Sequence, residues 1–304
     1  MDIMKLENIM IEEAVEIAEG NKKLYEEKFG KFRQWLKQQA HLPQDISDNR
    51  LRFTLLSSKL DLEKAKKRLD SQYTLRTLIP EFFANYDPQI DNITLVRKCI
   101  QWVALPKLTP EKIRISVYRF INEDASIFHL SDVLKYIFML TDVRLEEDMV
   151  NSDILIIDCI YLTLNHLLKY TPNLVRKLDL CLEAYGLRYK SIYIINASSY
   201  IDRILKIIKA FMSPKIYGRM KVVESGIESI YEIISKSNLP SDYGGEQPSI
   251  EALTDMWYAK LLERREWLLE QEKVKSNESL RTNSVINADE LFGINGTFNK
   301  LEID

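Results

Sequence analysis

The segment that decides the fold runs from Gly186 to Val223 and reads GLRYKSIYIINASSYIDRILKIIKAFMSPKIYGRMKVV. Residues 191–196 form a short apolar run rich in isoleucine, which indicates a β-strand rather than a helix. A turn of small residues follows, and residues 201–212 then repeat their apolar side chains at helical spacing. Ser213 and Pro214 are typical of a helix start, because serine caps free N–H groups and proline fits the first turn. The segment therefore predicts a strand, an amphipathic helix and a second, short helix.

The amphipathic helix predicted at 201–212 separates apolar from charged side chains. Arg203, Lys206 and Lys209 carry positive charge on one side. Such a helix is commonly a crossover packed on a sheet, so the pattern alone does not distinguish a fixed crossover from a mobile cover. The apolar side consists of Ile201, Ile204, Leu205, Ile208, Phe211 and Met212.

Four basic residues flank the predicted strand and helix. Arg188 and Lys190 alternate near the start of the strand, and Lys215 and Arg219 lie four residues apart, on one face of the second helix. Basic patches are common on protein surfaces. Spacing alone therefore leaves open both a solvated surface and a specific anion site.

Strand and helix patterns alternate through the rest of the chain, after a helical N-terminal part. Helical spacing covers residues 3–40 and resumes after Pro43, where Asp61 is the expected N-cap of a helix. Because helical segments separate the strands, we expect βαβ units around a mixed or parallel sheet. Further strands are predicted at 113–120, 154–157 and 220–223, further helices at 131–149, 164–185, 227–236 and 250–272, and a mobile tail from Val274 onward.

The composition bounds the class of protein and its compartment. The 304 residues are 46% hydrophobic and 29% charged, as in ordinary globular proteins, and the net charge of −3 argues against a nucleic-acid partner. Three cysteines form no CxxC pair, no apolar run reaches the length of about 18 residues that indicates a membrane span, and the acidic start is not a signal peptide. We therefore expect a cytoplasmic protein.

No constellation for catalysis or metal binding stands out. The sequence contains no GxSxG, GxxxxGK[ST], GxGxxG or HExxH motif, and His41, His129 and His166 are isolated from one another. Asp158 ends a predicted strand, where capping the next turn is the expected role because no partner base is apparent. We therefore predict no catalytic residue, no metal site and no cofactor.

Three stretches together resemble the CRAL-TRIO family, which includes tocopherol-transfer, retinaldehyde-binding and phosphatidylinositol-transfer proteins. They are the segment 186–223, the phrase LPSDYGG at 239–245 followed by Glu246, and the helical block at 49–83. The resemblance implies an α/β fold in which a sheet forms the floor of an apolar cavity, helices flank it and a mobile gate helix covers it. The implied domains are a helical N-terminal domain over 1–90, a CRAL-TRIO lipid-binding domain over 91–250, and a C-terminal helix with a flexible tail over 251–304.

The resemblance also implies a function. The chain is expected to bind one tocopherol-, retinoid- or carotenoid-like ligand and to transfer it between membranes, without catalysing a reaction. Arg188, Lys190, Lys215 and Arg219 are expected to grip a phosphoinositide headgroup and so to promote opening of the gate. The expected ligand-lining residues are Val133, Ile137, Leu140, Ile154, Ile156, Ile194, Ile201, Leu205 and Ile208.

Departures from the family pattern leave the identity of the ligand open. Gly186 stands where proline is usual, Tyr161 occupies a commonly glycine position, and Ser57-Ser58 replaces a basic pair. Two alternatives remain beside the transfer protein. One is a phospholipid- or phosphatidylinositol-binding regulator or scaffold without transfer activity, whose cavity has collapsed, and the other is an enzyme acting on a lipid or small ester. For the transfer protein we expect a monomer that associates peripherally and transiently with membranes.

Overall fold

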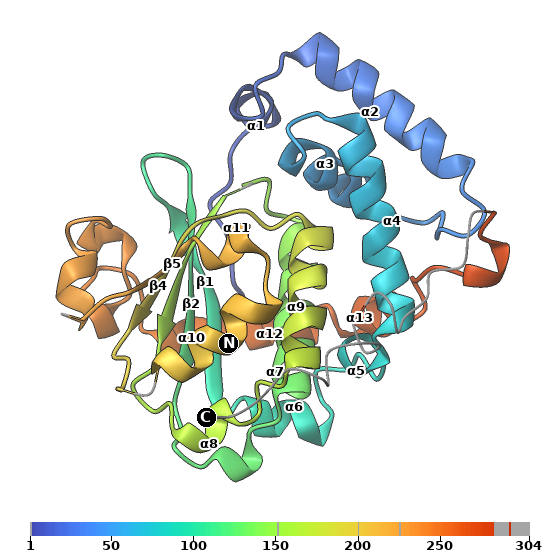
Figure 1. Cartoon of the computed structure of the whole chain (residues 1–304). Coiled ribbons are helices and arrows are strands. Elements are labelled where there is room, and N and C mark those ends of the chain that lie inside the picture. The colour runs from blue at the N-terminus through green and yellow to red at the C-terminus, as the bar shows by residue number, and fades with distance from the viewer. Residues whose placement is uncertain (1, 151, 200, 225, 283–291, 293–304) are drawn as a thin grey trace.

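The computed structural model describes residues 2–150, 152–199, 201–224, 226–282 and 292, which build a mixed sheet with helices packed around it (Figure 1). The five strands follow one another across the sheet in chain order. The first pair is antiparallel and the remaining pairs are parallel, so the α/β architecture expected from the sequence is present. The strands are β1 (Ile100–Leu108), β2 (Arg114–Phe120), β3 (Asp153–Asp158), β4 (Tyr189–Ile195) and β5 (Met220–Val222).

The helices fall into an N-terminal group and a group around the sheet. In the N-terminal group, α1 to α4 surround a hydrophobic cluster of their own, and α4 packs along α9 of the second group (Figure 1). The helices are α1 (Ile11–Ile17), α2 (Lys22–Lys37), α3 (Asp48–Ser57), α4 (Leu62–Leu78), α5 (Pro80–Phe83), α6 (Asp91–Val96), α7 (Leu130–Leu145), α8 (Leu164–Leu167), α9 (Pro172–Tyr185), α10 (Ile201–Phe211), α11 (Pro214–Tyr217), α12 (Ile250–Glu263) and α13 (Arg265–Gln271).

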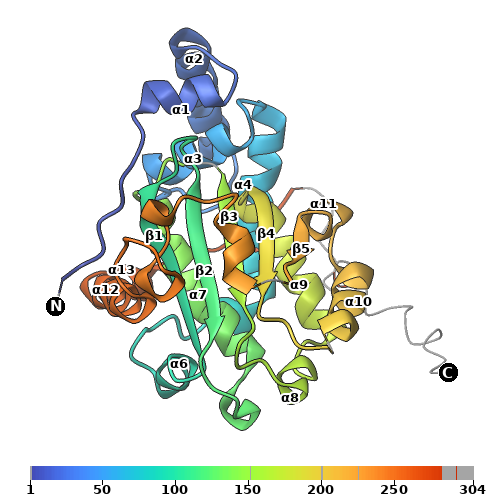
Figure 2. The same cartoon turned by 90° about the vertical axis from the view of Figure 1, so that its left-hand side faces the viewer.

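The two faces of the sheet are covered by different parts of the chain (Figure 2). Successive side chains of a strand point to opposite faces, so Leu155 and Ile157 of β3 face α7, α9 and α10. Ile154 and Ile156 point to the other face, which the segment 226–247 covers. The sheet is therefore buried on both faces.

The phrase LPSDYGG fixes that covering segment to the end of β3. The hydroxyl of Tyr243 donates to the buried carboxylate of Asp158 at 2.8 Å. A Cβ on Gly245 would lie 2.0 Å from the carbonyl oxygen of Leu239, so only glycine fits there. The other carboxylate oxygen of Asp158 accepts from the backbone N–H of Ile160 at 3.2 Å, which confirms its predicted role in capping the next turn.

One helix prediction is wrong at the N-terminus, where residues 3–10 are extended instead of helical. The reason is a set of polar contacts that tie Glu7 to the sheet. Its carboxylate accepts from the backbone N–H of Leu108 at 2.9 Å, and its carbonyl accepts from the guanidinium of Arg114 at 2.5 Å. The predicted N-cap of α4 is confirmed, since the side chain of Asp61 accepts a hydrogen bond from the backbone N–H of Lys64, in the first turn of the helix, at 3.1 Å.

A second helix prediction, for residues 227–236, is also wrong. The chain forms two short 3-10 turns there, Gly226–Ile230 and Lys236–Asn238. Local polar contacts favour the turns, because the hydroxyl of Ser235 accepts from the N–H of Ser237 and the Asn238 amide donates to the Leu108 carbonyl at 2.8 Å. Strand β1 has no counterpart among the strands expected from the sequence.

A buried ion cluster joins the N-terminal helices to the rest of the molecule. The carboxylate of Asp142 on α7 accepts from Arg76 of α4 at 2.7 Å, from Arg50 of α3 at 3.0 Å and from the hydroxyl of Tyr86 at 2.8 Å. Burial opposes ionisation of Asp142, but the two guanidinium groups outweigh it and hold its pKa below the ordinary value. The cluster therefore fixes α3 and α4 against α7.

We predict that Asp142→Asn lowers the free energy of unfolding at pH 7 by about 3–5 kcal/mol, because two buried cations lose their counter-charge. Urea denaturation measures the change. The matched variant Asp45→Asn, at an exposed aspartate, should alter it by less than about 0.5 kcal/mol. Because the pKa of Asp142 is depressed in the folded state, its contribution is complete above about pH 4 and is lost as pH falls below that. Equal effects of the two variants would contradict the role of the cluster.

Candidate functional site

An apolar cavity of about 160 Å³ lies between the sheet and helices α7, α9 and α10. None of the described residues that line it carries a charge. The lining residues are Trp102, Tyr118, Leu130, Val133, Leu134, Ile137, Leu155, Ile157, Tyr170, Val175, Leu178, Leu182, Tyr189, Ile192, Ile208, Met212, Ile216 and Met220.

Three of the nine residues expected to line a cavity do so, namely Val133, Ile137 and Ile208. Ile154 and Ile156 lie on the other face of the sheet, where Leu155 and Ile157 would have been the correct choice for this face. A strand buried on both faces has no polar alternation, so its sequence gives no signal about which face a residue occupies.

The other four expected residues lie near the cavity without lining it. Ile194 pairs with Ile157 on the cavity face of the sheet, closer to the carboxyl ends of the strands. Leu140 is buried in the hydrophobic core. Ile201 and Leu205 of α10 pack against the same core.

The cavity is small for a whole lipid. Its volume is close to that of a protein cavity that holds benzene, whereas pockets for drug-sized ligands measure roughly 300–1,000 Å³. In this form of the protein the cavity admits a ring-sized group. A longer guest requires α10 to move outward or its side chains to repack.

Helix α10 is held mainly by apolar contacts. It buries Ile201 and Ile204, and Met212 directly after it is buried as well. The backbone N–H of Ser213 donates to the carboxylate of the buried Asp179 on α9 at 2.9 Å. This hydrogen bond fixes the C-terminal end of α10, so an outward movement would pivot there.

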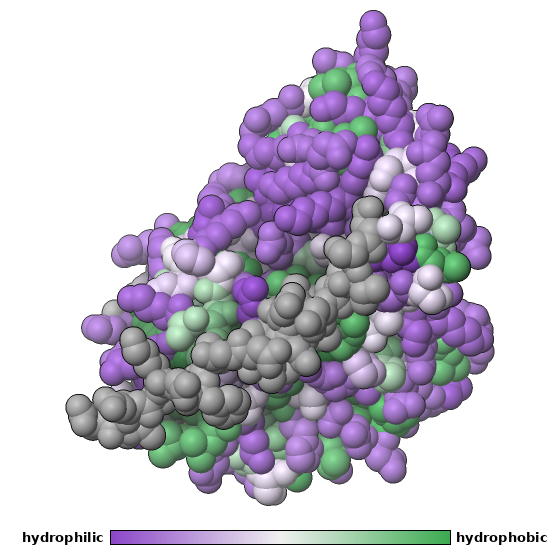
Figure 3. All heavy atoms as spheres, turned by 45° about the vertical axis from the view of Figure 1, so that its right-hand side comes forward, coloured by the Kyte–Doolittle hydropathy of each residue, from purple (hydrophilic) through white to green (hydrophobic). Residues whose placement is uncertain are grey.

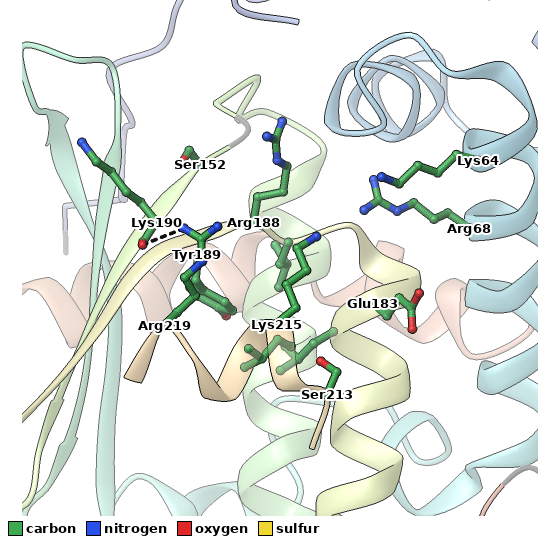
Figure 4. A pocket seen from close by; sticks show the side chains of 13 residues that line it. Lys64, Arg68, Ser152, Glu183, Arg188, Tyr189, Lys190, Ser213, Lys215 and Arg219 are labelled. Carbon is green, nitrogen blue, oxygen red and sulfur yellow. Dashed lines mark hydrogen bonds between the residues drawn. The ribbon is translucent and has the colours of Figure 1, made fainter. Parts of the chain in front are cut away.

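A second pocket, of about 480 Å³, gathers the predicted basic residues (Figure 4). Arg188 comes from just before β4, Lys215 from α11, and Arg219 from the turn before β5. Lys190 of β4 borders the pocket, but its side chain points away from the other cations (Figure 4), on the side where Glu111 lies. Arg219 donates to the backbone carbonyl of Lys190 at 3.0 Å. We call this group, with the residues added below, the basic pocket.

Two further cations reach the basic pocket from the N-terminal helices. Lys64 and Arg68 lie one turn apart on α4, and Figure 4 shows both pointing across the pocket toward Arg188 and Lys215. Their spacing of four residues indicates one helical face, which is the signal that sequence reasoning missed. No feature of the sequence indicated that these two residues would lie beside the start of a strand more than 100 residues later in the chain.

Two departures from the family pattern, Ser57-Ser58 and Gly186, lie in contact with each other where α3 and α4 approach the sheet domain. Arg68 donates to the carbonyl of Ser57 at 2.8 Å and to the hydroxyl of Ser58 at 3.0 Å, so the two serines orient a cation from α4. Gly186 has φ +71°, and a Cβ on it would lie 2.7 Å from the Ser57 hydroxyl. Glycine therefore permits the close approach of the two parts.

Like charges crowd the basic pocket, and the described lining residues include a single carboxylate, Glu183. Burial and then the neighbouring Lys64, Arg68, Arg188 and Arg219 lower the pKa of Lys215 below its ordinary value. A polyanion would relieve this repulsion. The arrangement is therefore suited to binding an anion.

The basic pocket and the apolar cavity share a wall. Leu182, Tyr189 and Ile216 line both of them. On the short helix α11, Lys215 contributes to the basic pocket while its neighbour Ile216 contributes to both. Because only Met212 and Ser213 separate α10 from α11, the helix that covers the cavity leads directly into the wall of the basic pocket.

An exposed apolar patch lies near the carboxyl ends of the strands. Ile160, Tyr161, Leu164 and Leu168, from α8 and the turn before it, are all exposed, and Leu168 is 72% exposed. Both α8 and α10 lie at the lower end of the molecule, where Figure 3 shows apolar surface, whereas the N-terminal helices above are largely hydrophilic. We call these four residues the apolar patch.

Other chemistry has no support in the described part of the chain. There, no cluster of histidine, cysteine and acidic residues could hold a metal ion, and no helix is long and apolar enough to cross a membrane. Burial raises the pKa of the Cys99 thiol to about 11 and that of the Cys159 thiol to about 12, so both are poor nucleophiles.

Comparison with known proteins identifies the class that this fold and these pockets define. Residues 101–245 match the CRAL/TRIO domain and residues 21–93 match the Pinta-like UBA domain. The match shows that residues 101–245 form a CRAL/TRIO domain, as the sequence resemblance indicated.

The relatives are distant. The chain is 24% identical over 229 residues to human "Alpha-tocopherol transfer protein-like", covering 74% of this chain and 66% of that protein. It is 28% identical over 153 residues to mouse "Clavesin-2", covering 49% and 46%. The crystal structure of Sfh5 superimposes with a TM-score of 0.51 at 10% identity, covering 82% of this chain and 98% of Sfh5, which supports the shared fold alone.

We predict that the double variant Lys64→Gln, Arg68→Gln raises the pKa of Lys215 toward its ordinary value, because two of the cations that depress it are removed. NMR titration of the Lys215 side chain measures the change. The matched control is Lys67→Gln on the same helix, which lies outside the basic pocket and should leave that pKa unaltered. An unchanged pKa in the double variant would mean that α4 does not act on this pocket.

Proposed function

We propose that this protein binds a small hydrophobic ligand of the tocopherol, retinoid or carotenoid kind and transfers it between membranes. It acts as a cytoplasmic monomer that associates peripherally with membranes, and a phosphoinositide headgroup in the basic pocket promotes the opening of α10. The observation that carries the proposal is the wall shared by the basic pocket and the apolar cavity. The match of residues 101–245 to the CRAL/TRIO domain and the similarity to human "Alpha-tocopherol transfer protein-like" support it.

The charge of the basic pocket supports a phosphorylated headgroup as its ligand. Arginine guanidinium groups bind phosphate through two parallel hydrogen bonds, and lysine acts as a point charge. Cations from α4, from Arg188 just before β4 and from α11 converge on one space of about 480 Å³. A headgroup with several phosphates could contact cations on more than one side of the pocket. A single phosphate would contact the cations on one side alone.

The buried side of α10 supports opening at a membrane rather than in water. Exposing Ile201, Ile204 and Met212 to water would cost roughly 5 kcal/mol or more, at roughly 1.5–3 kcal/mol for each side chain. A bilayer surface offsets this cost, because the apolar side chains enter the lipid while Arg203 and Lys206 meet anionic headgroups. Ligand release is therefore coupled to membrane contact.

The position of the apolar patch supports the view that the end of the molecule near α10 faces the membrane. Its residues lie near the beginning of α10, at the carboxyl ends of the strands (Figure 1). Exposed apolar side chains that gather in one region mark interaction surfaces more often than scattered ones do. A protein docked through this patch would bring α10 to the bilayer.

We predict that changing Arg188, Lys190, Lys215 and Arg219 together to alanine reduces ligand transfer to vesicles containing phosphatidylinositol bisphosphate by at least about tenfold. The reason is the loss of charge-assisted contacts to phosphate. A fluorescent tocopherol analogue in donor vesicles reports the transfer rate. On vesicles without phosphoinositide, wild type and variant should transfer at the same basal rate.

The control carries the same change in charge elsewhere: Lys22, Lys23, Lys37 and Lys98 are exposed and lie outside the basic pocket. Their replacement by alanine should leave the stimulation by phosphoinositide intact. If the variant of the basic pocket retains full stimulation, the headgroup role is refuted.

We predict that Leu164→Gln combined with Leu168→Gln weakens binding to phosphatidylcholine vesicles by about tenfold or more, because two leucines no longer transfer from water to lipid. Vesicle co-sedimentation measures the affinity. Met10→Gln with Ile17→Gln is the matched control, since both residues are exposed apolar side chains in the N-terminal part. Equal losses in the two variants would argue against a specific docking end.

The small volume of the apolar cavity favours one other candidate, a phosphoinositide-binding regulator or scaffold without transfer activity. The basic pocket would serve this function unchanged. Native mass spectrometry of the purified protein separates the two candidates. A co-purified lipophilic molecule supports the carrier, and protein without any such molecule supports the regulator.

A further inference from the structure

A buried histidine lies on the inner side of the turn that carries the apolar patch. His166 of α8 is fully buried, whereas Leu164 and Leu168 beside it are exposed. The imidazole ring packs edge-on against Phe120 and Phe128, with ring centroids 5.5 and 5.0 Å apart. Histidine is the side chain that gains a charge just below neutral pH, so the surroundings of this ring are sensitive to protons.

The Nδ1 atom of His166 closes the N-terminal end of α8. The backbone N–H of Thr163 donates to Nδ1 at 3.2 Å, and the Thr163 hydroxyl lies 2.9 Å from the same atom. The Thr163 side chain in turn accepts from the backbone N–H of His166, which completes a capping box. Because Nδ1 accepts a hydrogen bond, the hydrogen of the neutral ring lies on Nε2.

Protonation of His166 acts directly on this cap. The second proton enters at Nδ1, where it removes the acceptor of the Thr163 N–H and leaves two donors facing each other. The new charge lies against two uncharged aromatic rings, and Nε2 has no hydrogen-bond partner among the described residues. A buried charge without an acceptor costs free energy, so a charged His166 disfavours the closed position of α8.

Two charged groups also act on the ring. Burial holds the pKa of His166 below its ordinary value, while Asp124 favours the charged form and Lys169 opposes it. Asp124 is exposed and already accepts from the backbone N–H of Ser126 at 2.9 Å, so it compensates for burial only in part. The ring therefore stays neutral at pH 7 while α8 is closed.

An outward movement of α8 would add apolar surface to the apolar patch. Leu162 and Leu167 lie on either side of His166 and are buried. Both leucines would reach the surface together with the exposed residues around them. The released form would therefore present a larger apolar area to a bilayer, and membrane affinity rises with that area.

We propose that protonation of His166 releases α8 and enlarges the apolar patch, so that the protein binds membranes more strongly at acidic pH. The inference rests on docking through the apolar patch, which is part of the proposed function. It adds the condition under which docking strengthens. Anionic membrane surfaces attract cations, protons among them, so the switch would act at the surfaces that the basic pocket recognises.

The test measures co-sedimentation with phosphatidylcholine vesicles at pH 7.5 and at pH 5.5, because this lipid stays net uncharged at both. A released histidine has the ordinary pKa of about 6.5 and the buried one a lower pKa, so protons favour release only as pH falls below about 6.5. One pH unit further down, the shift toward release reaches at most about tenfold. We expect wild type to bind about threefold to tenfold more tightly at pH 5.5 than at pH 7.5.

Two variants isolate the contribution of His166. His166→Gln does not titrate and keeps the cap, because glutamine at this position of a capping box accepts from the same backbone N–H. It should bind vesicles at both pH values as wild type does at pH 7.5. His129→Gln is the matched control, since His129 is exposed and lies outside the apolar patch, and it should keep the pH dependence of wild type.

Amide hydrogen exchange of wild type provides a second measurement that needs no variant. After correction for the intrinsic effect of pH, the amides of α8 should exchange faster at pH 5.5 than at pH 7.5, and those of α7 should not. Equal protection of α8 at the two pH values would overturn the proposal.

The outcomes separate this inference from the proposed function. If wild type binds vesicles equally at both pH values, or if His166→Gln keeps the full pH dependence, His166 does not control docking. Docking through the apolar patch then stands as long as Leu164→Gln with Leu168→Gln weakens binding. If wild type binds the vesicles at neither pH, docking through the apolar patch fails together with this inference.

Discussion

The buried carboxylate of Asp142 is the constraint on which the rest of the structure depends. It holds one guanidinium from α3 and another from α4 against α7. Arg76 also donates to the backbone carbonyl of Gln271, after α12, so the same cluster ties down the C-terminal helices. A buried pair of this kind adds little net stability over an apolar contact, but a broken one is costly. Its effect is thus to fix the position of α4, since any other position would leave buried charges unpaired.

The position of α4 in turn creates the basic pocket. Arg68 lies across from Arg188 because α4 packs along α9, and the approach is close enough that Gly186 tolerates no side chain. The hydroxyl and carbonyl groups of Ser57 and Ser58 then orient Arg68. The N-terminal helices thereby contribute two cations, Lys64 and Arg68 of α4, to the basic pocket beside the sheet.

Local features of this fold could be read from the sequence, and long-range ones could not. The cap at Asp61 depends on neighbouring residues, and so does the strand character of β2, β3 and β4. The choice between Ile156 and Leu155 as cavity residues depends on the register of neighbouring strands, which a uniformly apolar strand does not encode. The basic residues of 188–219 were found through family resemblance, whereas Lys64 of α4 joins them only through packing.

Volume and charge together constrain how such a protein could take up a guest. A cavity of about 160 Å³ excludes a whole isoprenoid lipid, so uptake would require α10 to move or its side chains to repack. The hydrogen bond from Ser213 to Asp179 would make the C-terminal end of α10 the pivot of such a movement. Just beyond that pivot, Lys215 and Ile216 place the basic pocket and the cavity wall on one short helix. An anion shifts an equilibrium only by its differential affinity for the two states. Burial and the neighbouring cations lower the pKa of Lys215, so a polyanion bound in the basic pocket would act on α11, which lines both pockets and directly follows the covering helix α10.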